Sequence, residues 1–176
     1  MSLAADVRDL WERHERGDLD AESAGADALA TLGALLDALE AGEVRAAEPD
    51  GDDWAVNAWV KRGVLLTFAL REARTREYGD VQYTDVLPQA DTAAYADRGT
   101  RNTPDGTVIR RGAHVGADCI LMSPAFVNVG AHVGDGTLVD SCDTVGSCAQ
   151  VGRDVKLGAN TLIGGVLEPV ERAPVV

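Results

Sequence analysis

The histidines are the residues of this sequence whose type and spacing most directly suggest metal binding or acid–base chemistry. His114 and His132 are 18 residues apart, and the only other histidine is His14, close to the N-terminus. A protein zinc site needs three or four ligands, which this pair cannot supply. We therefore predict no metal site and interpret His114 and His132 as two imidazoles on an outer surface.

The three cysteines, Cys119, Cys142 and Cys148, also offer little chemistry. Their number is odd and no CxxC spacing occurs, so neither a disulfide framework nor a zinc cluster is indicated. Reduced thiols of this kind are typical of a cytosolic protein.

Charge and hydropathy exclude two classes of partner. The chain has 16 basic and 29 acidic residues, a net charge of −13, which disfavours nucleic acid because phosphate contacts need a basic face. No apolar run approaches the roughly 20 residues that span a bilayer, and the charged N-terminus lacks the apolar core of a signal peptide. We expect a cytoplasmic protein that binds small molecules, with no nucleic-acid or membrane partner.

The elements that would position these residues differ between the two halves of the chain. Residues 1–76 are predicted to form a helical domain with a short hairpin around the PDGDD segment. Ser23 and Asn57 are expected to cap the second and third helices, and Gly17 and Gly42 to end the first and second. Residues 77–106 contain many turn-forming residues and are predicted to be a connector.

From residue 109 onward, an aliphatic residue recurs at every sixth position. The series is Ile109, Val115, Leu121, Val127, Val133, Val139, Val145, Val151, Leu157 and Ile163. Glycine often follows these positions, and a small residue usually precedes them by two. Neither a helix nor an ordinary strand has period six, so the pattern predicts a repeat architecture.

Each hexapeptide is interpreted as one short strand and one corner. The aliphatic residue points inward, and the next residue turns the corner with the positive φ that favours Gly, Asn or Asp. Three hexapeptides close a triangular coil, so residues 18 apart stack and Ile109, Val127, Val145 and Ile163 form one inner ladder. The predicted fold class is α+β: a helical domain, then a parallel β-helix of about three coils over 107–168, then a tail over 169–176.

Particular segments connect this repeat with a known family. Hexapeptide repeats of this kind are similar to those of acyltransferases that use acyl thioesters. VDSCDTVGSCAQ (139–150), GGVLEP (164–169) and the helix–hairpin–helix stretch 35–70 closely resemble the tetrahydrodipicolinate N-succinyltransferases. The resemblance implies a left-handed coil and a homotrimer. It further implies transfer of the succinyl group from succinyl-CoA to opened tetrahydrodipicolinate, in the diaminopimelate route to lysine. Succinyl-CoA would be a co-substrate, and the enzyme would have no bound cofactor.

The resemblance also implies site residues. The family aspartate of the VD motif corresponds to Asp140, which would bind the substrate ammonium group and assist proton transfer. The alternative is that Asp140 is a corner residue that tolerates left-handed backbone geometry. A family arginine that binds a substrate carboxylate corresponds best to Arg101, through the R-x-x-P match that ends at Pro104. Arg110 and Arg111 are second choices, and a solvated surface arginine is the alternative for Arg101.

The family sequence continues beyond GGVLEP, with a catalytic glutamate that neither Glu168 nor Glu171 matches. The 176-residue chain is accordingly expected to be truncated and inactive by itself. Two alternatives remain: a hexapeptide-repeat CoA-dependent N-acyltransferase with another substrate, or a catalytically inactive fragment. Other hexapeptide acyltransferases use a histidine base. If the chain is an N-acyltransferase with another substrate, His114 and His132 are the candidates for that base.

Overall fold

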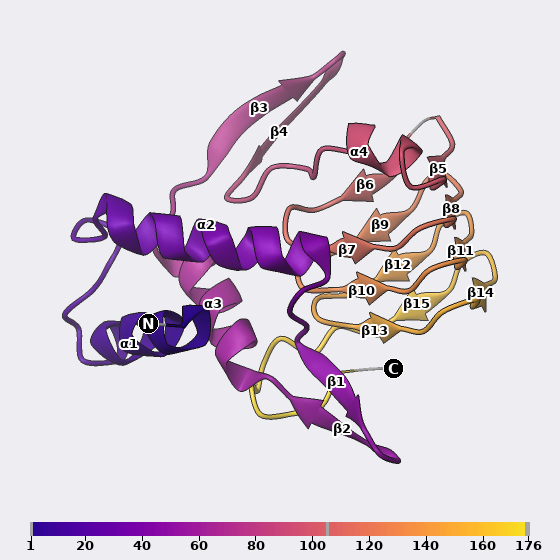
Figure 1. Ribbon diagram of the computed structural model, residues 1–176. Coiled ribbons are helices and arrows are strands. Elements are labelled where there is room, and N and C mark those ends of the chain that lie inside the picture. Colours follow the sequence, from indigo (N-terminus) through magenta and orange to yellow (C-terminus); the bar gives the residue numbers. More distant parts are fainter. Residues whose placement is uncertain (1, 105, 175–176) are drawn as a thin grey trace.

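A computed structural model describes residues 2–104 and 106–174. Its first part holds three helices and a hairpin, with the bounds α1 (Leu3–Glu15), α2 (Ala26–Ala41), β1 (Ala47–Asp50), β2 (Asp53–Val56) and α3 (Ala58–Ala69). Figure 1 shows the helices gathered on one side of the molecule, with the β1–β2 hairpin projecting from them. The predicted helices and hairpin are confirmed. Among the described residues, no helix is long and apolar enough to cross a membrane.

The helix ends agree with the sequence only in part. Gly42 ends α2 in the left-handed conformation, with φ of 75°, as predicted. The prediction for Ser23 was wrong: α2 begins after Gly25, and the Ser23 hydroxyl instead bonds the Asp20 carboxylate in the preceding turn. Asn57 does precede α3, but its side-chain amide donates to the carbonyl of Arg45 rather than capping the helix. In both cases the polar side chain bonds another group, and no side-chain hydrogen bond to a helix N–H forms.

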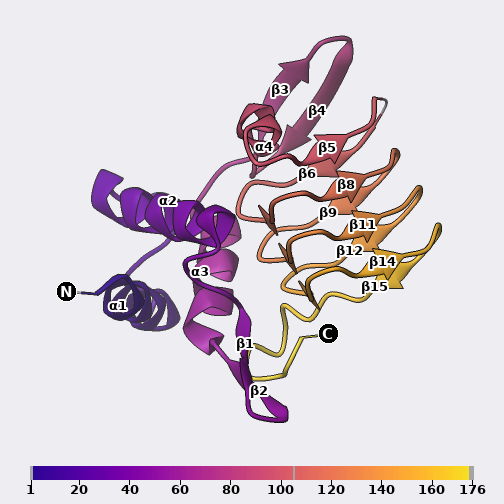
Figure 2. The ribbon, with the colours of Figure 1, turned by 45° about the vertical axis from the view of Figure 1, so that its right-hand side comes forward.

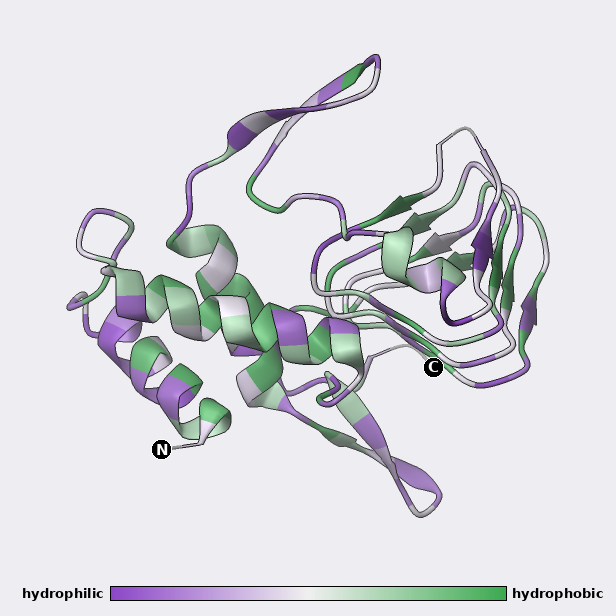
Figure 3. Cartoon of the chain, turned by 45° about the horizontal axis from the view of Figure 1, so that its top comes forward, coloured by the Kyte–Doolittle hydropathy of each residue, from purple (hydrophilic) through white to green (hydrophobic). Residues whose placement is uncertain are grey.

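The stretch over 77–106 contains more regular structure than the many turn formers suggested. It contains most of a second hairpin, β3 (Arg74–Tyr78) and β4 (Val81–Asp85), and the short helix α4 (Ala93–Ala96). Both hairpins are largely hydrophilic, whereas α2 and α3 carry long hydrophobic runs (Figure 3). Tyr95 of α4 is 4% exposed and belongs to the core inside the coils. Thus α4 covers the first coil, as capping segments of repeat proteins do.

The second part is a left-handed parallel β-helix of about three turns, made of two-residue strands. These are β5 (Arg101–Asn102), β6 (Val108–Ile109), β7 (His114–Val115), β8 (Ile120–Leu121), β9 (Phe126–Val127), β10 (His132–Val133), β11 (Leu138–Val139), β12 (Thr144–Val145), β13 (Gln150–Val151), β14 (Lys156–Leu157) and β15 (Leu162–Ile163). They form three parallel sheets, β7–β10–β13, β5–β8–β11–β14 and β6–β9–β12–β15. Figure 2 shows the coils stacked one upon another.

The predicted inward register is confirmed. Ile109 pairs with Val127, Val127 with Val145, and Val145 with Ile163, which forms the inner ladder. Of the ten period-six residues, nine are buried, and Ile163 in the last described coil is partly buried. Burial of these aliphatic side chains is the main favourable term for closing each coil.

The predicted cause of the recurrent glycines was wrong. Positive φ recurs at positions three residues after the aliphatic residue, for example at Gly112, Asp118 and Cys142, and not at the residue directly after it. The glycines that follow the aliphatic residues serve another purpose. A Cβ on Gly134 would lie 2.7 Å from backbone atoms of Gly152, and one on Gly146 would lie 2.2 Å from the Gly165 nitrogen. Close stacking of successive coils therefore excludes a side chain at Gly134 and at Gly146.

The helical part packs directly on the β-helix. One core cluster joins Leu36 and Leu39 of α2 and Val64 of α3 to Val129 and Cys148, which lie at corners of the coils. Arg111 adds ion pairs with Asp37 and Glu40 of α2. These contacts hold the C-terminal end of α2 against the strand β7.

Candidate active site

Asp140 lies at the corner that follows β11. Its side chain is half-buried, and its Oδ1 accepts a hydrogen bond of 2.7 Å from the Ser141 backbone N–H. Its own backbone N–H donates to Asp143 Oδ2, also at 2.7 Å. The left-handed residue of this corner is Cys142, with φ of 64°. A need for left-handed geometry therefore does not explain an aspartate at position 140.

Asp143 is a residue that the sequence reasoning missed. It is 1% exposed, and both of its carboxylate oxygens accept backbone N–H groups, from Asp140 and from Thr161 of the next coil. The carboxylate thus fixes the backbone beside Asp140. The signal was present in the sequence, because Asp143 occupies the repeat position that elsewhere is mostly Ala, Cys or Thr.

A shallow pocket of about 230 Å³ adjoins this corner. Its lining includes Phe126, Cys142, Asp143 and Thr144, so it opens beside the turn that carries Asp140. Asp140 is not among the lining residues. Within one chain, Asp140 therefore lies beside this pocket and does not line it.

Arg101 lies on the sheet whose strand β11 leads into the corner of Asp140. Arg101 belongs to β5, which pairs with β8, and β8 pairs with β11, the strand before Asp140. Two parallel strand spacings of about 4.8 Å each separate these strands, so the two residues lie roughly 10 Å apart along the stack. The Arg101 side chain is exposed, and it forms no ion pair within residues 2–104 and 106–174. A substrate carboxylate could reach its guanidinium from solvent.

Arg110 and Arg111, the second choices, are already engaged. Arg110 binds the Asp85 carboxylate through two nitrogens, at 2.7 Å and 3.1 Å, and also donates to Asn128. Arg111 binds Asp37 and Glu40. These protein carboxylates already bind the guanidinium nitrogens that a substrate carboxylate would use.

His114 and His132 stack as expected for residues 18 apart, with ring centroids separated by 4.4 Å. Their interpretation as surface imidazoles needs correction, because both are half-buried at the junction with α2. His114 Nδ1 hydrogen-bonds the Glu40 carbonyl at 2.8 Å, and Nδ1 of His132 is buried without a hydrogen-bond partner among the described residues. Within the described chain, no group of three or more His, Cys, Asp or Glu is arranged to hold a metal.

Burial lowers the pKa of both imidazoles. For His132 the pKa falls to about 3, first because of desolvation and then because of the nearby positive charge of Arg45 and the ring of His114. The pKa of His114 is lowered by desolvation and by Arg98 and Arg45, against opposing effects of the Glu40 hydrogen bond and Asp135. Both rings are neutral at pH 7 and suited to packing.

We expect the free energy of unfolding to fall as the pH is lowered below 6.5, the ordinary histidine value. In that range the unfolded chain binds protons on both histidines, whereas folded His132 stays neutral until about pH 3. His132 then lowers stability by up to roughly 1.4 kcal/mol per pH unit, His114 acts in the same direction, and neither contributes above its unfolded pKa. Urea unfolding at several pH values measures this slope. The variant His132→Phe should reduce the slope, and an identical slope would contradict this account.

The comparisons with known proteins agree on one family. The family model for the tetrahydrodipicolinate N-succinyltransferase N-terminal region matches residues 2–70. Relatives named 2,3,4,5-tetrahydropyridine-2,6-dicarboxylate N-succinyltransferase come from several bacteria. That of Polynucleobacter asymbioticus is 43% identical over 97% of this chain, and that of Dechloromonas aromatica is 38% identical over 99% of it. The relative from Idiomarina loihiensis is 37% identical over 92% of the chain.

The chain spans 60–64% of the length of these relatives. The similarity nevertheless covers both the helical part and the β-helix, and it includes the corner that carries Asp140. Over the residues that it shares with them, the chain is therefore similar to the tetrahydrodipicolinate N-succinyltransferases in both of its parts.

Proposed function

We propose that this chain is part of an enzyme that transfers the succinyl group of succinyl-CoA to the amino group of opened tetrahydrodipicolinate, 2-amino-6-oxopimelate. The single observation that carries the proposal is the similarity to relatives of that name across at least 92% of the chain. The step would belong to lysine biosynthesis through diaminopimelate and would take place in the cytoplasm. Succinyl-CoA acts as a co-substrate, and no bound cofactor is required.

The chemistry assigns a task to each of the two site residues. The acceptor nitrogen attacks the thioester carbonyl, an N–C bond forms, the C–S bond breaks, and the CoA thiolate takes up a proton. Because an ammonium group must lose a proton before it can attack, a carboxylate near it assists the reaction. Asp140 is proposed to bind the ammonium group and accept that proton. The exposed Arg101 guanidinium is proposed to hold a carboxylate of the acceptor by two parallel hydrogen bonds.

The incompletely covered position of Asp140 supports assembly with neighbouring subunits, which we propose to form a homotrimer. In one chain this carboxylate is half-buried beside a shallow pocket, whereas enzyme sites generally enclose most of a small ligand's surface. We propose that the neighbouring subunit's β-helix covers this face and completes the site. Arg101, on β5, and Asp140, at the corner that follows β11 of the same sheet, would then line one groove between subunits.

The proposal is tested by measuring release of the CoA thiol by the protein expressed from its complete reading frame. With an aminopimelate acceptor we expect release from succinyl-CoA to be much faster than from acetyl-CoA, and to depend on the acceptor. A preference for acetyl-CoA or for amino-sugar acceptors would instead identify an N-acyltransferase of another specificity. Absence of acceptor-dependent release with either donor would contradict the proposal.

A further inference from the structure

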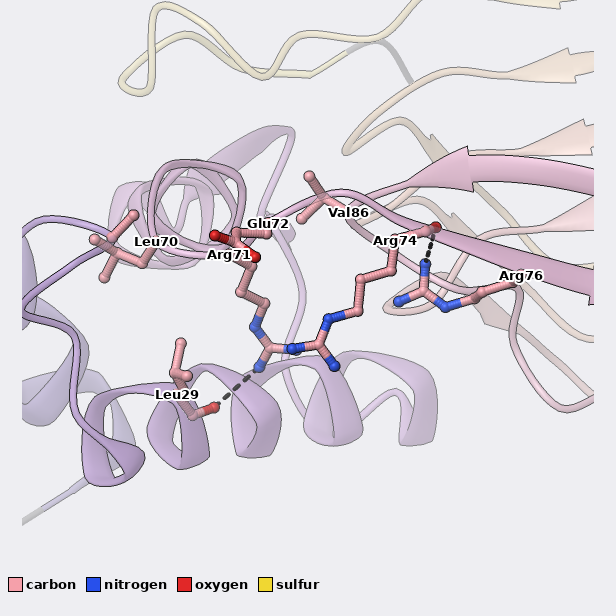
Figure 4. A pocket seen from close by; sticks show the side chains of 8 residues that line it. Leu29, Leu70, Arg71, Glu72, Arg74, Arg76 and Val86 are labelled. Carbon is pink, nitrogen blue, oxygen red and sulfur yellow. Dashed lines mark hydrogen bonds between the residues drawn. The ribbon is translucent and has the colours of Figure 1, made fainter.

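A second pocket lies in the helical half, away from the β-helix. It has a volume of about 390 Å³ and is bounded by Leu29 of α2, Leu70 and Arg71 at the end of α3, Glu72, and Arg74 and Arg76 of β3. Figure 4 shows the side chains of Arg71 and Arg74 reaching toward one another above α2, with Arg76 beside them. None of its lining residues belongs to the β-helix or to the corner of Asp140.

The positive charge of this pocket is not balanced by the protein. Within residues 2–104 and 106–174, none of Arg71, Arg74 and Arg76 forms an ion pair. Glu72 is the single acidic residue of the lining. The pKa of Arg71 is lowered by burial and then by repulsion from Arg111 and Arg74. An unbalanced cluster of arginines is unexpected in a chain of net charge −13.

Two of the arginines are held in place by backbone groups. Arg71 Nη2 donates to the Leu29 carbonyl at 2.9 Å, and Arg76 Nη1 donates to the carbonyls of Asp85 and Arg74 at 2.7 Å and 3.2 Å. These neutral acceptors orient the guanidinium groups without cancelling their charge. Arg71 Nε is buried and has no hydrogen-bond partner among the described residues. Arg71 therefore keeps one buried donor for which the described chain supplies no acceptor, and an unsatisfied buried donor is costly.

The geometry of the donors favours one kind of anion. A carboxylate has two oxygens and is filled by a single bidentate arginine, whereas a phosphate group offers three or more acceptor sites and a larger charge. We propose that this pocket binds the phosphate groups of a small anion. The binding is separate from the acyl transfer proposed above and does not depend on it.

Isothermal titration calorimetry with pyrophosphate tests this inference on the protein from its complete reading frame, at constant ionic strength set with chloride. The variant Arg74→Gln should weaken binding at least tenfold, because it removes one positive charge and the guanidinium donors of the pocket. The fold should stay intact, because the Arg74 side chain is exposed. The control Arg8→Gln removes the same charge from an exposed position on α1 and should leave the affinity unchanged. Inorganic phosphate and CoA, titrated in the same variants, distinguish a free phosphate compound from a nucleotide-linked one.

Each result decides the question. Loss of affinity for any of the three probes in Arg74→Gln alone supports the pocket as the site. The inference is overturned if the unaltered protein binds none of the probes, or if both variants bind as the unaltered protein does. Equal weakening in both variants would show a general effect of net charge and would also overturn it.

Discussion

Replacing Asp140 with asparagine should lower the turnover number of the complete enzyme at least tenfold while leaving its melting temperature nearly unchanged. The substitution removes the negative charge that is proposed to bind the ammonium group and accept its proton, and acid–base groups typically contribute 10²–10⁴-fold to rate. The fold should tolerate the change, because the amide oxygen of asparagine can still accept the Ser141 N–H. Steady-state assays of CoA release and thermal unfolding measure the two quantities.

The matched control is Asp143→Asn, three positions along the same corner. Both Asp143 oxygens accept backbone N–H groups, so an asparagine NH₂ would have to face one of these donors. An unsatisfied buried donor costs about 1–3 kcal/mol, and this variant should therefore lose stability. If Asp140→Asn kept full turnover, Asp140 would be a corner residue without a catalytic role.

Gly146→Ala should destabilise the protein by about 1–3 kcal/mol or more, the usual cost of forcing atoms into packed space. An alanine Cβ at this position would lie 2.2 Å from the Gly165 nitrogen and 2.7 Å from its Cα. Both are backbone atoms of the next coil, so relief would require the two coils to move apart. Separation would weaken the ladder bonds between them, including that from the Gly146 N–H to the Ile163 carbonyl at 2.8 Å. Urea unfolding of the 176-residue chain measures the loss.

Gly158→Ala provides the control, since Gly158 follows Leu157 as Gly146 follows Val145. A Cβ on Gly158 has no atom of the described residues within 4 Å, and its φ is not positive. The alanine should be neutral or slightly stabilising, because it restricts the unfolded chain. Equal losses in the two variants would mean that both glycines are required for backbone conformation, and the stacking explanation would be wrong.

The sequence by itself determined the periodic parts of this protein. Period six predicted which side chain of each hexapeptide points inward, and the ladder from Ile109 to Ile163 follows it. The helices could also be predicted from the sequence, because their apolar stripes and the left-handed Gly42 are local features. Such features depend on residues close in the chain, and the motif around Asp140 could be recognised because it too is one continuous segment.

The tertiary structure alone decided how these parts meet. The sequence could not show that α2 covers the His114–His132 stack, because the contact joins Glu40 to a residue 74 positions away. It could not show that Asp85 binds the Arg110 guanidinium, or that Gly134 and Gly146 face backbone atoms of the next coil. Whether a charged side chain is free to bind a ligand depends on which distant residues reach it first. That outcome is set by the packing of the helical part, the second hairpin and the β-helix against one another.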